Sequence, residues 1–349
     1  MRWRTWIAGS LIVGTLGWVG AVAAGPGKVY VADEEGDTVT VLDATSFARL
    51  ATVPVGREPH NVQVSPDGRW AWVTINDEVQ AKGEEEKHPP TGMSKREHEA
   101  MAEIGQVWAI DTATDRVAAK ILVGKHPAHV VLAPDGRRAF VTNGGENTVS
   151  VIDTAARKVV ATIPVGTYPH GIRVSPDGRE AYVANLKGGT VSVIDTEARR
   201  EVAKISVGKG PAQTGFTPDG RLAFASLSQE NAVAVIDPAA RKIVKKIPVG
   251  LGPIQVYATP DSRLLFVANQ GSKRAPGRTV SVIDLATLEV TKTIETAAGA
   301  HGVVVGADGR YAYVTNIYAN SVSVIEVKEF KVAATVPVGD GPNGISVTP

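Results

Sequence analysis

The chain has 349 residues, of which 43% are hydrophobic and 21% charged, a composition typical of a soluble globular protein that buries a large core. Its 37 Lys and Arg residues nearly balance its 36 Asp and Glu residues, so we expect no nucleic-acid partner and no electrostatic attachment to a membrane surface. The absence of cysteine excludes disulfides, cysteine catalysis, iron–sulfur clusters and cysteine-linked haem.

Residues 1–24 have the pattern of a secretory signal peptide. Arg2 and Arg4 form a basic start, an uncharged apolar stretch follows, and Ala21-Val22-Ala23 resembles a cleavage site. We therefore expect a periplasmic or secreted mature protein, residues 25–349, with no membrane span after cleavage. The alternative is a retained membrane anchor, because the stretch from Ile7 to Ala24 has about the 18 residues that a spanning helix needs.

A unit of about 42 residues repeats along the rest of the chain. Its clearest marker is a Pro-Asp-Gly-like turn, whose aspartates are Asp67, Asp135, Asp177, Asp219, Asp261 and Asp308. Each unit holds four short β-branched runs between turn residues, a pattern that predicts the blades of a β-propeller.

The unit from His170 to Gly208 shows the expected strands most clearly. We assign strand A to Gly171–Ser175, strand B to Glu180–Asn185, strand C to Thr190–Asp195 and strand D to Glu201–Val207. Asp195 ends strand C, and we interpret its carboxylate as a cap for the next turn rather than as a catalytic group.

Counting the units predicts seven blades. Six begin at His60, Ala128, His170, Ala212, Ile254 and His301. The segment Val29–Gly56 would supply strands B, C and D of a seventh, and Asn343–Pro349 its strand A. The fold is therefore predicted to be all-β, a ring of four-stranded antiparallel blades whose last blade joins both ends of the chain.

The repeated motifs also resemble a known family. Tyr182-Val183-Ala184-Asn185, Phe140-Val141-Thr142-Asn143 and Tyr313-Val314-Thr315-Asn316, each preceded by the turn and followed by a Thr-Val-Ser-Val-Ile-Asp-like run, are similar to the YVTN-repeat, YncE-like seven-bladed β-propellers. The resemblance covers Val29–Pro349. It implies the fold but leaves the function open, because members of the family differ in function.

Two insertions interrupt the repeat between strands B and C. The longer one, residues 78–105, has a charged first half, followed by a capping box at Ser94 and Glu97 that predicts a helix over Lys95–Ile104 with Met101 and Ile104 packing down. The shorter one covers Gly271–Arg278. In a propeller the B–C and D–A connections share one face, called the top face here, so both insertions are expected there, as a lid, a partner surface or tolerated loops.

Polar residues open each strand A on the same face. Seven residues before the turn aspartate stand His60, Ala128, His170, Ala212, Ile254, His301 and Asn343, and six before stand Asn61, His129, Gly171, Gln213, Gln255, Gly302 and Gly344. Every blade therefore brings an imidazole or an amide to the mouth of the central channel. His126 lies close to His129 in the sequence.

Imidazole is a common ligand of Zn, Cu and Fe, so His60, His129, His170, His301 and His126 are the candidate metal ligands, and copper or another transition metal is the cofactor we consider first. The architecture is similar to that of nitrous oxide reductase, whose propeller histidines hold copper, and of haem d1 propellers. The chain lacks the complete histidine set of the former.

Other interpretations remain open. Asn61, Gln213, Gln255 and Asn343 suit a polar small molecule or a peptide at the channel mouth, or a rim that only orders water. The top face and its insertion could serve as a protein-interaction scaffold. Similarity to virginiamycin B lyase, also a seven-bladed propeller, would instead imply a metal-assisted lyase or hydrolase, with Glu58 and the histidines as acid–base groups.

Overall fold

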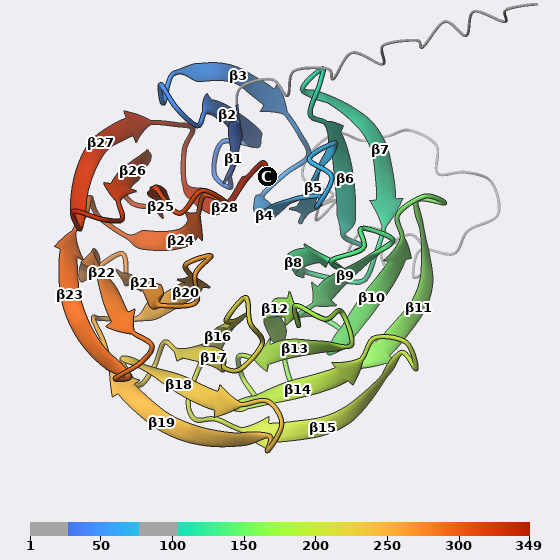
Figure 1. Cartoon of the computed structure of the whole chain (residues 1–349). Coiled ribbons are helices and arrows are strands. Elements are labelled where there is room, and N and C mark those ends of the chain that lie inside the picture. The colour runs from blue at the N-terminus through green and yellow to red at the C-terminus, as the bar shows by residue number, and fades with distance from the viewer. Residues whose placement is uncertain (1–26, 77–103) are drawn as a thin grey trace, which may run out of the picture.

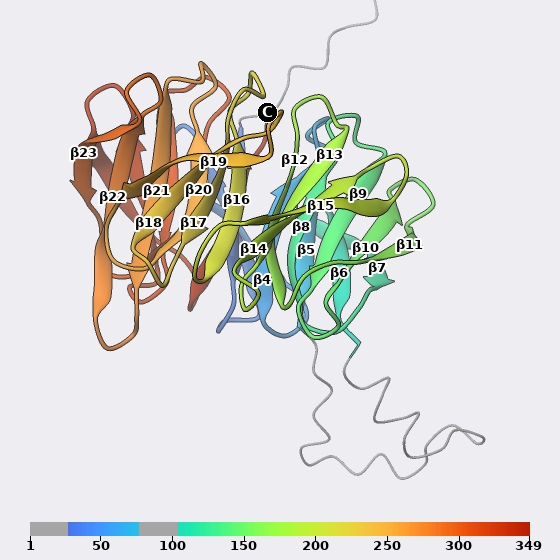
Figure 2. The same ribbon diagram turned by 90° about the horizontal axis from the view of Figure 1, so that it is seen from below.

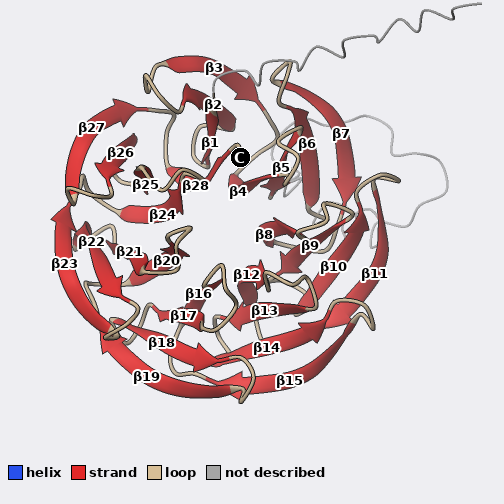
Figure 3. Cartoon of the chain, viewed as in Figure 1, coloured by secondary structure: helices blue, strands red, loops and turns tan. Residues whose placement is uncertain are grey.

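The computed structural model describes residues 27–76 and 104–349, which form 28 β-strands and no helix. The strands make seven four-stranded antiparallel sheets, and Figure 1 shows these sheets arranged as blades around a central axis. Figure 3 shows that, among the described residues, turns and loops connect the strands. The predicted seven-bladed β-propeller is confirmed.

The blades are numbered here in chain order, with the closing blade as blade 7. Blade 1 consists of β4 (Pro59–Val64), β5 (Trp70–Ile75), β6 (Gln106–Asp111) and β7 (Arg116–Leu122). Blade 2 consists of β8 (Pro127–Leu132), β9 (Arg138–Asn143), β10 (Thr148–Asp153) and β11 (Lys158–Pro164). Blade 3 consists of β12 (Pro169–Val174), β13 (Glu180–Asn185), β14 (Thr190–Asp195) and β15 (Arg200–Ser206).

The second half of the ring follows the same plan. Blade 4 consists of β16 (Pro211–Phe216), β17 (Ala223–Leu227), β18 (Ala232–Asp237) and β19 (Lys242–Pro248). Blade 5 consists of β20 (Pro253–Ala258), β21 (Leu264–Gly271), β22 (Pro276–Asp284) and β23 (Glu289–Glu295). Blade 6 consists of β24 (Ala300–Val305), β25 (Tyr311–Asn316), β26 (Ser321–Glu326) and β27 (Lys331–Pro337). Blade 7 consists of β28 (Pro342–Val347), β1 (Lys28–Asp33), β2 (Thr38–Asp43) and β3 (Arg49–Pro54).

Burial explains the different sequence patterns of the strands. The second and third strands of a blade lie between neighbouring blades and are buried on both faces, so they read as continuous apolar runs. The outermost strand, such as β11, alternates between exposed and covered positions because only one of its faces packs. Seven apolar clusters result, each formed by residues of two adjacent blades.

The turn residues act as the sequence predicts. Gly178 adopts a φ of 76°, and Asp177 accepts hydrogen bonds from the Ser175 hydroxyl (2.6 Å) and the Arg179 amide (3.1 Å). Asp195 accepts bonds from the amides of Glu197 (3.0 Å) and Ala198 (2.8 Å) and so caps the turn after β14. Its expected structural role is confirmed.

Blade 7 closes the ring in the predicted way. Strand β28 pairs with β1, with Val29 opposite Val347 and Val31 opposite Ile345. The Lys28 ammonium donates to Asp115 of blade 1 at 2.7 Å, and the Tyr30 hydroxyl donates to the same carboxylate at 2.7 Å. The first and last strands are therefore joined to each other and to the neighbouring blade.

The B–C and D–A connections lie on one side of the ring, the top face, and the A–B and C–D turns lie on the other, the bottom face; Figure 2 shows the ring from the side. The insertion at Gly271–Arg278 lengthens β21 and β22 into a hairpin whose pairing extends to Gly271 and Pro276. Of the longer insertion, residues 77–103 fall outside the described residues, as do residues 1–26. The predicted helix therefore stays a prediction, as does the signal peptide. Within the described residues no helix has the length and apolarity to cross a membrane.

Candidate metal centre at the channel mouth

A β-bulge opens the innermost strand of every blade. In blade 1 the pairing of β4 with β5 shifts by one residue between Pro59 and Val62, and the same shift recurs in the other six blades. A bulge adds a residue and redirects the side chains beside it. This explains how histidines at successive positions, His60 in one blade and His129 in the next, approach the same point.

Side-chain hydroxyls on the second strands hold these openings in place. Thr142 accepts the amide hydrogen of His129 at 3.0 Å and donates to the carbonyl of His170 in the next blade at 2.6 Å. Four blades have this arrangement, through Thr74, Thr142, Ser226 and Thr315. The third residue of the YVTN-like motif thus links adjacent blades directly beneath the channel mouth.

Three histidines from three consecutive blades meet at the mouth. The potential ligand atoms of His60, His129 and His170 all lie within 4.8 Å of one another. Their ring centroids are 5.7 Å apart for His60 and His129, 5.2 Å for His60 and His170, and 5.0 Å for His129 and His170. The structure therefore brings together three of the five candidate ligands.

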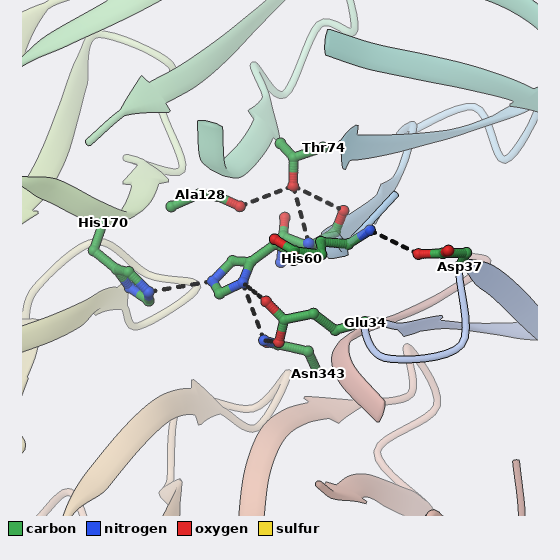
Figure 4. Close-up of polar contacts among 9 residues, drawn as sticks. Glu34, Asp37, His60, Thr74, Ala128, His170 and Asn343 are labelled. Atoms are coloured by element: carbon green, nitrogen blue, oxygen red, sulfur yellow. Dashed lines mark hydrogen bonds and ion pairs between the residues drawn. The ribbon is translucent and has the colours of Figure 1, made fainter. Parts of the chain in front are cut away.

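A hydrogen-bonded chain orients two of these imidazoles (Figure 4). His60 Nδ1 donates to Glu34 Oε1 at 2.8 Å, and its Nε2 is 3.2 Å from His170 Nε2. His170 Nδ1 donates to the Ala212 carbonyl at 2.9 Å. Since each Nδ1 is engaged, both Nε2 atoms face the shared point between the rings, and a proton on one of them can be donated to the other.

Electrostatics favour one proton over several in this cluster. Burial opposes charge on His60, but the Glu34 charge and hydrogen bond outweigh it and raise the His60 pKa. Burial likewise opposes ionisation of Glu34, yet the charge and hydrogen bond of His60 lower the Glu34 pKa to about 2. Burial and the positive His60 ring lower the pKa of His170 to about 4. At neutral pH His170 is therefore a neutral imidazole, the form that binds metals.

His129 and His301 are buried, and each has at least one ring nitrogen without a hydrogen-bond partner among the described residues. His129 is 0% exposed and its Nε2 has no hydrogen-bond partner among the described residues, while His301 is 5% exposed and both of its ring nitrogens lack one there. Burial, followed by the neighbouring imidazoles, puts the pKa of His129 well below its usual value, and burial and His60 lower that of His301 to about 3. Orphaned buried nitrogens are costly unless a ligand or water satisfies them.

The predicted amide residues occupy the mouth but differ in what they contact. Asn343 donates to Glu34 at 2.6 Å and lies 3.1 Å from His60 Nδ1. Gln213 lies 3.4 Å from His129 Nδ1. Asn61 and Gln255 use their side-chain oxygens to accept backbone amides of Val130 (3.2 Å) and Val303 (3.4 Å). Asn343 and Gln213 therefore support the histidines, whereas Asn61 and Gln255 connect blades.

His126 lies apart from the other candidate ligands. It is exposed and has a φ of 49°, at the turn position just before the proline that opens β8. Glu58 and Tyr168 hold the equivalent left-handed position in blades 1 and 3, with φ of 48° and 54°. Proximity to His129 in the sequence is misleading here, because the turn directs residue 126 away from the strand that carries residue 129 inward.

Sequence analysis missed Glu34 as a functional residue. Glu34 follows the YVAD segment at the end of β1, on the B–C turn of blade 7, and this turn belongs to the top face. Tracing that face around the ring would have placed the carboxylate beside His60 of blade 1.

The donor set fits a transition-metal ion. For bonds of about 2.0–2.1 Å, two ligands of a tetrahedral metal are about 3.3–3.4 Å apart. The 3.2 Å between His60 Nε2 and His170 Nε2 is close to this spacing. A carboxylate that accepts from the other ring nitrogen of a ligating histidine, as Glu34 does from His60, is the usual outer support of such sites.

Comparison with known proteins gives matches consistent with this fold. A family model described as YNCE-like beta-propeller matches residues 104–349. Antigen Lp49 of Leptospira interrogans is 27% identical over 116 residues, which cover 33% of this chain and 23% of the antigen. The chain therefore matches only about a quarter of that relative's length.

Three solved structures are similar to this chain over most of its length. Hydrazine synthase of Kuenenia stuttgartiensis has a TM-score of 0.68 and 22% identity, covering 82% of this chain and 89% of that chain. A protein of unknown function from Desulfotomaculum acetoxidans has a TM-score of 0.74 and 15% identity, covering 92% and 98%. The dihydro-heme d1 dehydrogenase NirN, in complex with DHE, has a TM-score of 0.64 and 18% identity, covering 91% and 74%. At these identities the likeness concerns the fold alone.

Proposed function

The chain belongs to the YNCE-like beta-propeller family, and we propose that it is a binding protein that holds one divalent transition-metal ion at the top mouth of its channel through His60, His129 and His170. The observation that carries this proposal is the convergence of three imidazoles within 4.8 Å, from three separate blades. Three positions rigidly fixed by packed β-sheets give a preorganised site, which lowers the cost of binding.

Copper is the metal that the proposal favours. Imidazole ligands without thiolates suit Cu and Zn, and at equal geometry Cu²⁺ binds more tightly than Zn²⁺. Three protein ligands also leave a coordination position for a further ligand, an arrangement found in sites that act on or deliver something rather than in closed structural sites.

Binding would follow from the protonation state of the free site. The Nε2 atoms of His60 and His170 would hold the metal in competition with protons, and Glu34 would keep the His60 ring oriented through Nδ1. The Ala212 carbonyl does the same for His170. His301 and Asn343, at the same mouth, have unsatisfied buried polar atoms that could contact a further ligand of the metal.

The proposal predicts one tightly bound ion per chain. Metal-free protein without an affinity tag is dialysed to equilibrium against buffered Cu²⁺ and, separately, Zn²⁺, and bound metal is counted. The wild type is expected to bind one equivalent, and the His60→Ala/His129→Ala/His170→Ala variant is expected to lose at least 100-fold in affinity, since all its ligands are removed.

His126→Ala is the matched control, because His126 is exposed and outside the cluster. This control is expected to bind like the wild type. Substoichiometric metal in the wild type, or equal affinity in the wild type and the triple variant, would overturn the proposal.

The top face also supports a second candidate function, docking of a protein partner. The observation behind it is the β21–β22 hairpin, which extends the top face. In this hairpin the Nζ atom of the exposed Lys273 lies 3.7 Å from Glu35 Oε1 on blade 7. The double variant Lys273→Ala/Arg274→Ala, at the exposed tip of this hairpin, is then expected to abolish partner recovery while metal stoichiometry stays at one. Unchanged recovery would reject the docking role.

A further inference from the structure

The bottom end of the channel contains a charged side chain, Arg173, that has no counter-charge among the described residues. Arg173 lies on β12, and within residues 27–76 and 104–349 its guanidinium makes one hydrogen bond, from Nη1 to the Ile172 carbonyl at 3.3 Å, and no ion pair. It is partly buried, and desolvation lowers its pKa. A desolvated cation without a counter-charge is costly in a folded protein.

A cavity of about 160 Å³ adjoins this guanidinium. The innermost strands of blades 3, 4 and 5 form it, with the A–B turn prolines Pro176 and Pro218 at its rim. It therefore opens toward the bottom face, away from the histidines.

Two of the side chains that line the cavity, Arg173 and Tyr257, can donate hydrogen bonds. Arg173, Gly215 and Tyr257 stand four residues before the turn aspartates of consecutive blades, and since Gly215 has no side chain, none separates Arg173 from Tyr257 at this level. Within the described part of the chain the Tyr257 hydroxyl makes no hydrogen bond to another residue. The other members of this layer are Gln63, Val131, Val304 and Ser346, so Arg173 is its single charged residue.

We propose that this cavity is a second binding site, independent of the metal centre, which takes a small oxyanion through Arg173 with the Tyr257 hydroxyl as an additional donor. The planar guanidinium matches the two oxygens of a carboxylate or of an inorganic oxyanion. The cavity volume admits an ion the size of acetate, phosphate or sulfate. An oxyanion at this point supplies the counter-charge that the protein itself lacks.

Calorimetric titration of the metal-free protein in low-salt buffer tests this site, with sodium acetate, phosphate and sulfate as separate probes. At least one of them is expected to bind with a dissociation constant below about 10 mM. Binding of acetate alone identifies a carboxylate ligand, and binding of phosphate or sulfate an inorganic oxyanion.

Arg173→Gln removes the charge and keeps a polar side chain, and it is expected to weaken binding at least tenfold, the loss typical of a charge-assisted hydrogen bond. Arg179→Gln is the matched control, because Arg179 is an exposed arginine of the same blade on the bottom face, and it should bind like the wild type. Tyr257→Phe, which preserves packing, is expected to weaken binding about threefold.

The proposal is overturned if none of the three anions binds the wild type, or if Arg173→Gln and Arg179→Gln have equal effects. Should Arg173→Gln fail to fold, Tyr257→Phe decides, and unchanged affinity in that variant rejects the site. Because the titration is done without metal, failure here leaves the metal proposal untouched, and failure of metal binding leaves this one untouched.

Discussion

The two ends of the channel have opposite electrostatic properties. At the top mouth four histidines lie close together, and the pKa of three of them is lowered, whereas the Glu34 carboxylate raises that of His60. At the bottom end the Arg173 guanidinium donates one hydrogen bond, to the Ile172 carbonyl, and has no anionic partner among the described residues. The top mouth therefore has lone pairs to offer a cation, and the bottom end has donors to offer an anion.

The difference arises from single residues placed on an almost uniform scaffold. All seven blades share the bulge at the start of their innermost strand, and their turns are repeated. Only the side chains presented at each level vary. A ring of equivalent positions lets a change at one residue create a ligand or a charge without altering the fold.

The largest expected effect is acid sensitivity of the top mouth. Folding lowers the pKa of His170 from 6.5 to about 4 and that of His301 from 6.5 to about 3. Below pH 6.5 the unfolded chain therefore binds more protons at these two histidines than the folded protein does. Stability is then lost as pH falls from 6.5 toward 4, and every tenfold difference in proton affinity between the two states corresponds to about 1.4 kcal/mol. Urea unfolding with chelator at pH 7 and pH 4.5 measures this loss.

His301→Gln should reduce this loss more than Arg173→Gln, because Arg173 is only one of the smaller causes that lower the pKa of His129. Glu34 and His60 contribute outside this window, below pH 4.5 and above pH 6.5 respectively. Asp33, whose pKa burial raises to about 6, acts in the opposite direction but equally in all variants. Equal pH dependence in His301→Gln and the wild type would show that the buried imidazole is not held neutral.

The next effect concerns Glu34, which acts on the metal through His60. Glu34→Gln is expected to weaken Cu²⁺ binding 10- to 100-fold, as is usual for loss of a carboxylate behind a ligating histidine. Its removal also takes away the charge that raises the His60 pKa, so the proton competes less and the fall in affinity below neutral pH becomes shallower. Titrations at pH 6 and pH 8 measure both. If Glu34→Gln lost the same affinity for Cu²⁺ at both pH values, the proposed effect of Glu34 on His60 would be contradicted.

A smaller effect tests how the scaffold positions the histidines. Thr142→Val removes the hydroxyl that joins the His129 amide to the His170 carbonyl, and it is expected to cost about 1–3 kcal/mol of stability and to weaken metal binding. Thr315→Val removes the same kind of link between Gly302 and Asn343. It should cost similar stability but spare the affinity for metal. If both variants lose metal equally, the link does not position the ligands.

The smallest effect is coupling between the two ends. The charge of Arg173 lowers the pKa of His129, so charges at the two ends of the channel interact electrostatically. A bound metal ion should therefore strengthen oxyanion binding at the bottom end, and by reciprocity the anion should strengthen metal binding by the same factor. We expect less than tenfold, or below about 1.4 kcal/mol. Repeating the anion titration on metal-loaded protein measures this factor; a weaker affinity would contradict the sign.

The repeat made most of the fold predictable. Counting from the turn aspartates placed all seven blades, the closure by both termini and the approach of His60, His129 and His170, because each turn fixes the register of its strand. The same count could not separate His126, since its direction depends on a left-handed turn residue rather than on spacing.

Two features depended on contacts between neighbouring blades. Glu34 reaches His60 across the interface between blade 7 and blade 1, although the two residues lie only 26 positions apart in the chain. Among the described residues Arg173 lacks a counter-charge because the residues at the same level of the next two blades, Gly215 and Tyr257, have no carboxylate. The sequence pattern within one blade predicts neither the Glu34–His60 contact nor the missing counter-charge of Arg173.

The central claim is that three imidazoles from consecutive blades bind one metal ion. Pulsed electron paramagnetic resonance of the protein with one equivalent of Cu²⁺ tests it directly, because the remote nitrogen of each coordinated imidazole modulates the signal. The account predicts three coordinated imidazoles in the wild type and in His126→Ala, and two in His170→Ala. A spectrum with no imidazole modulation, or one that is unchanged in His170→Ala, would contradict it.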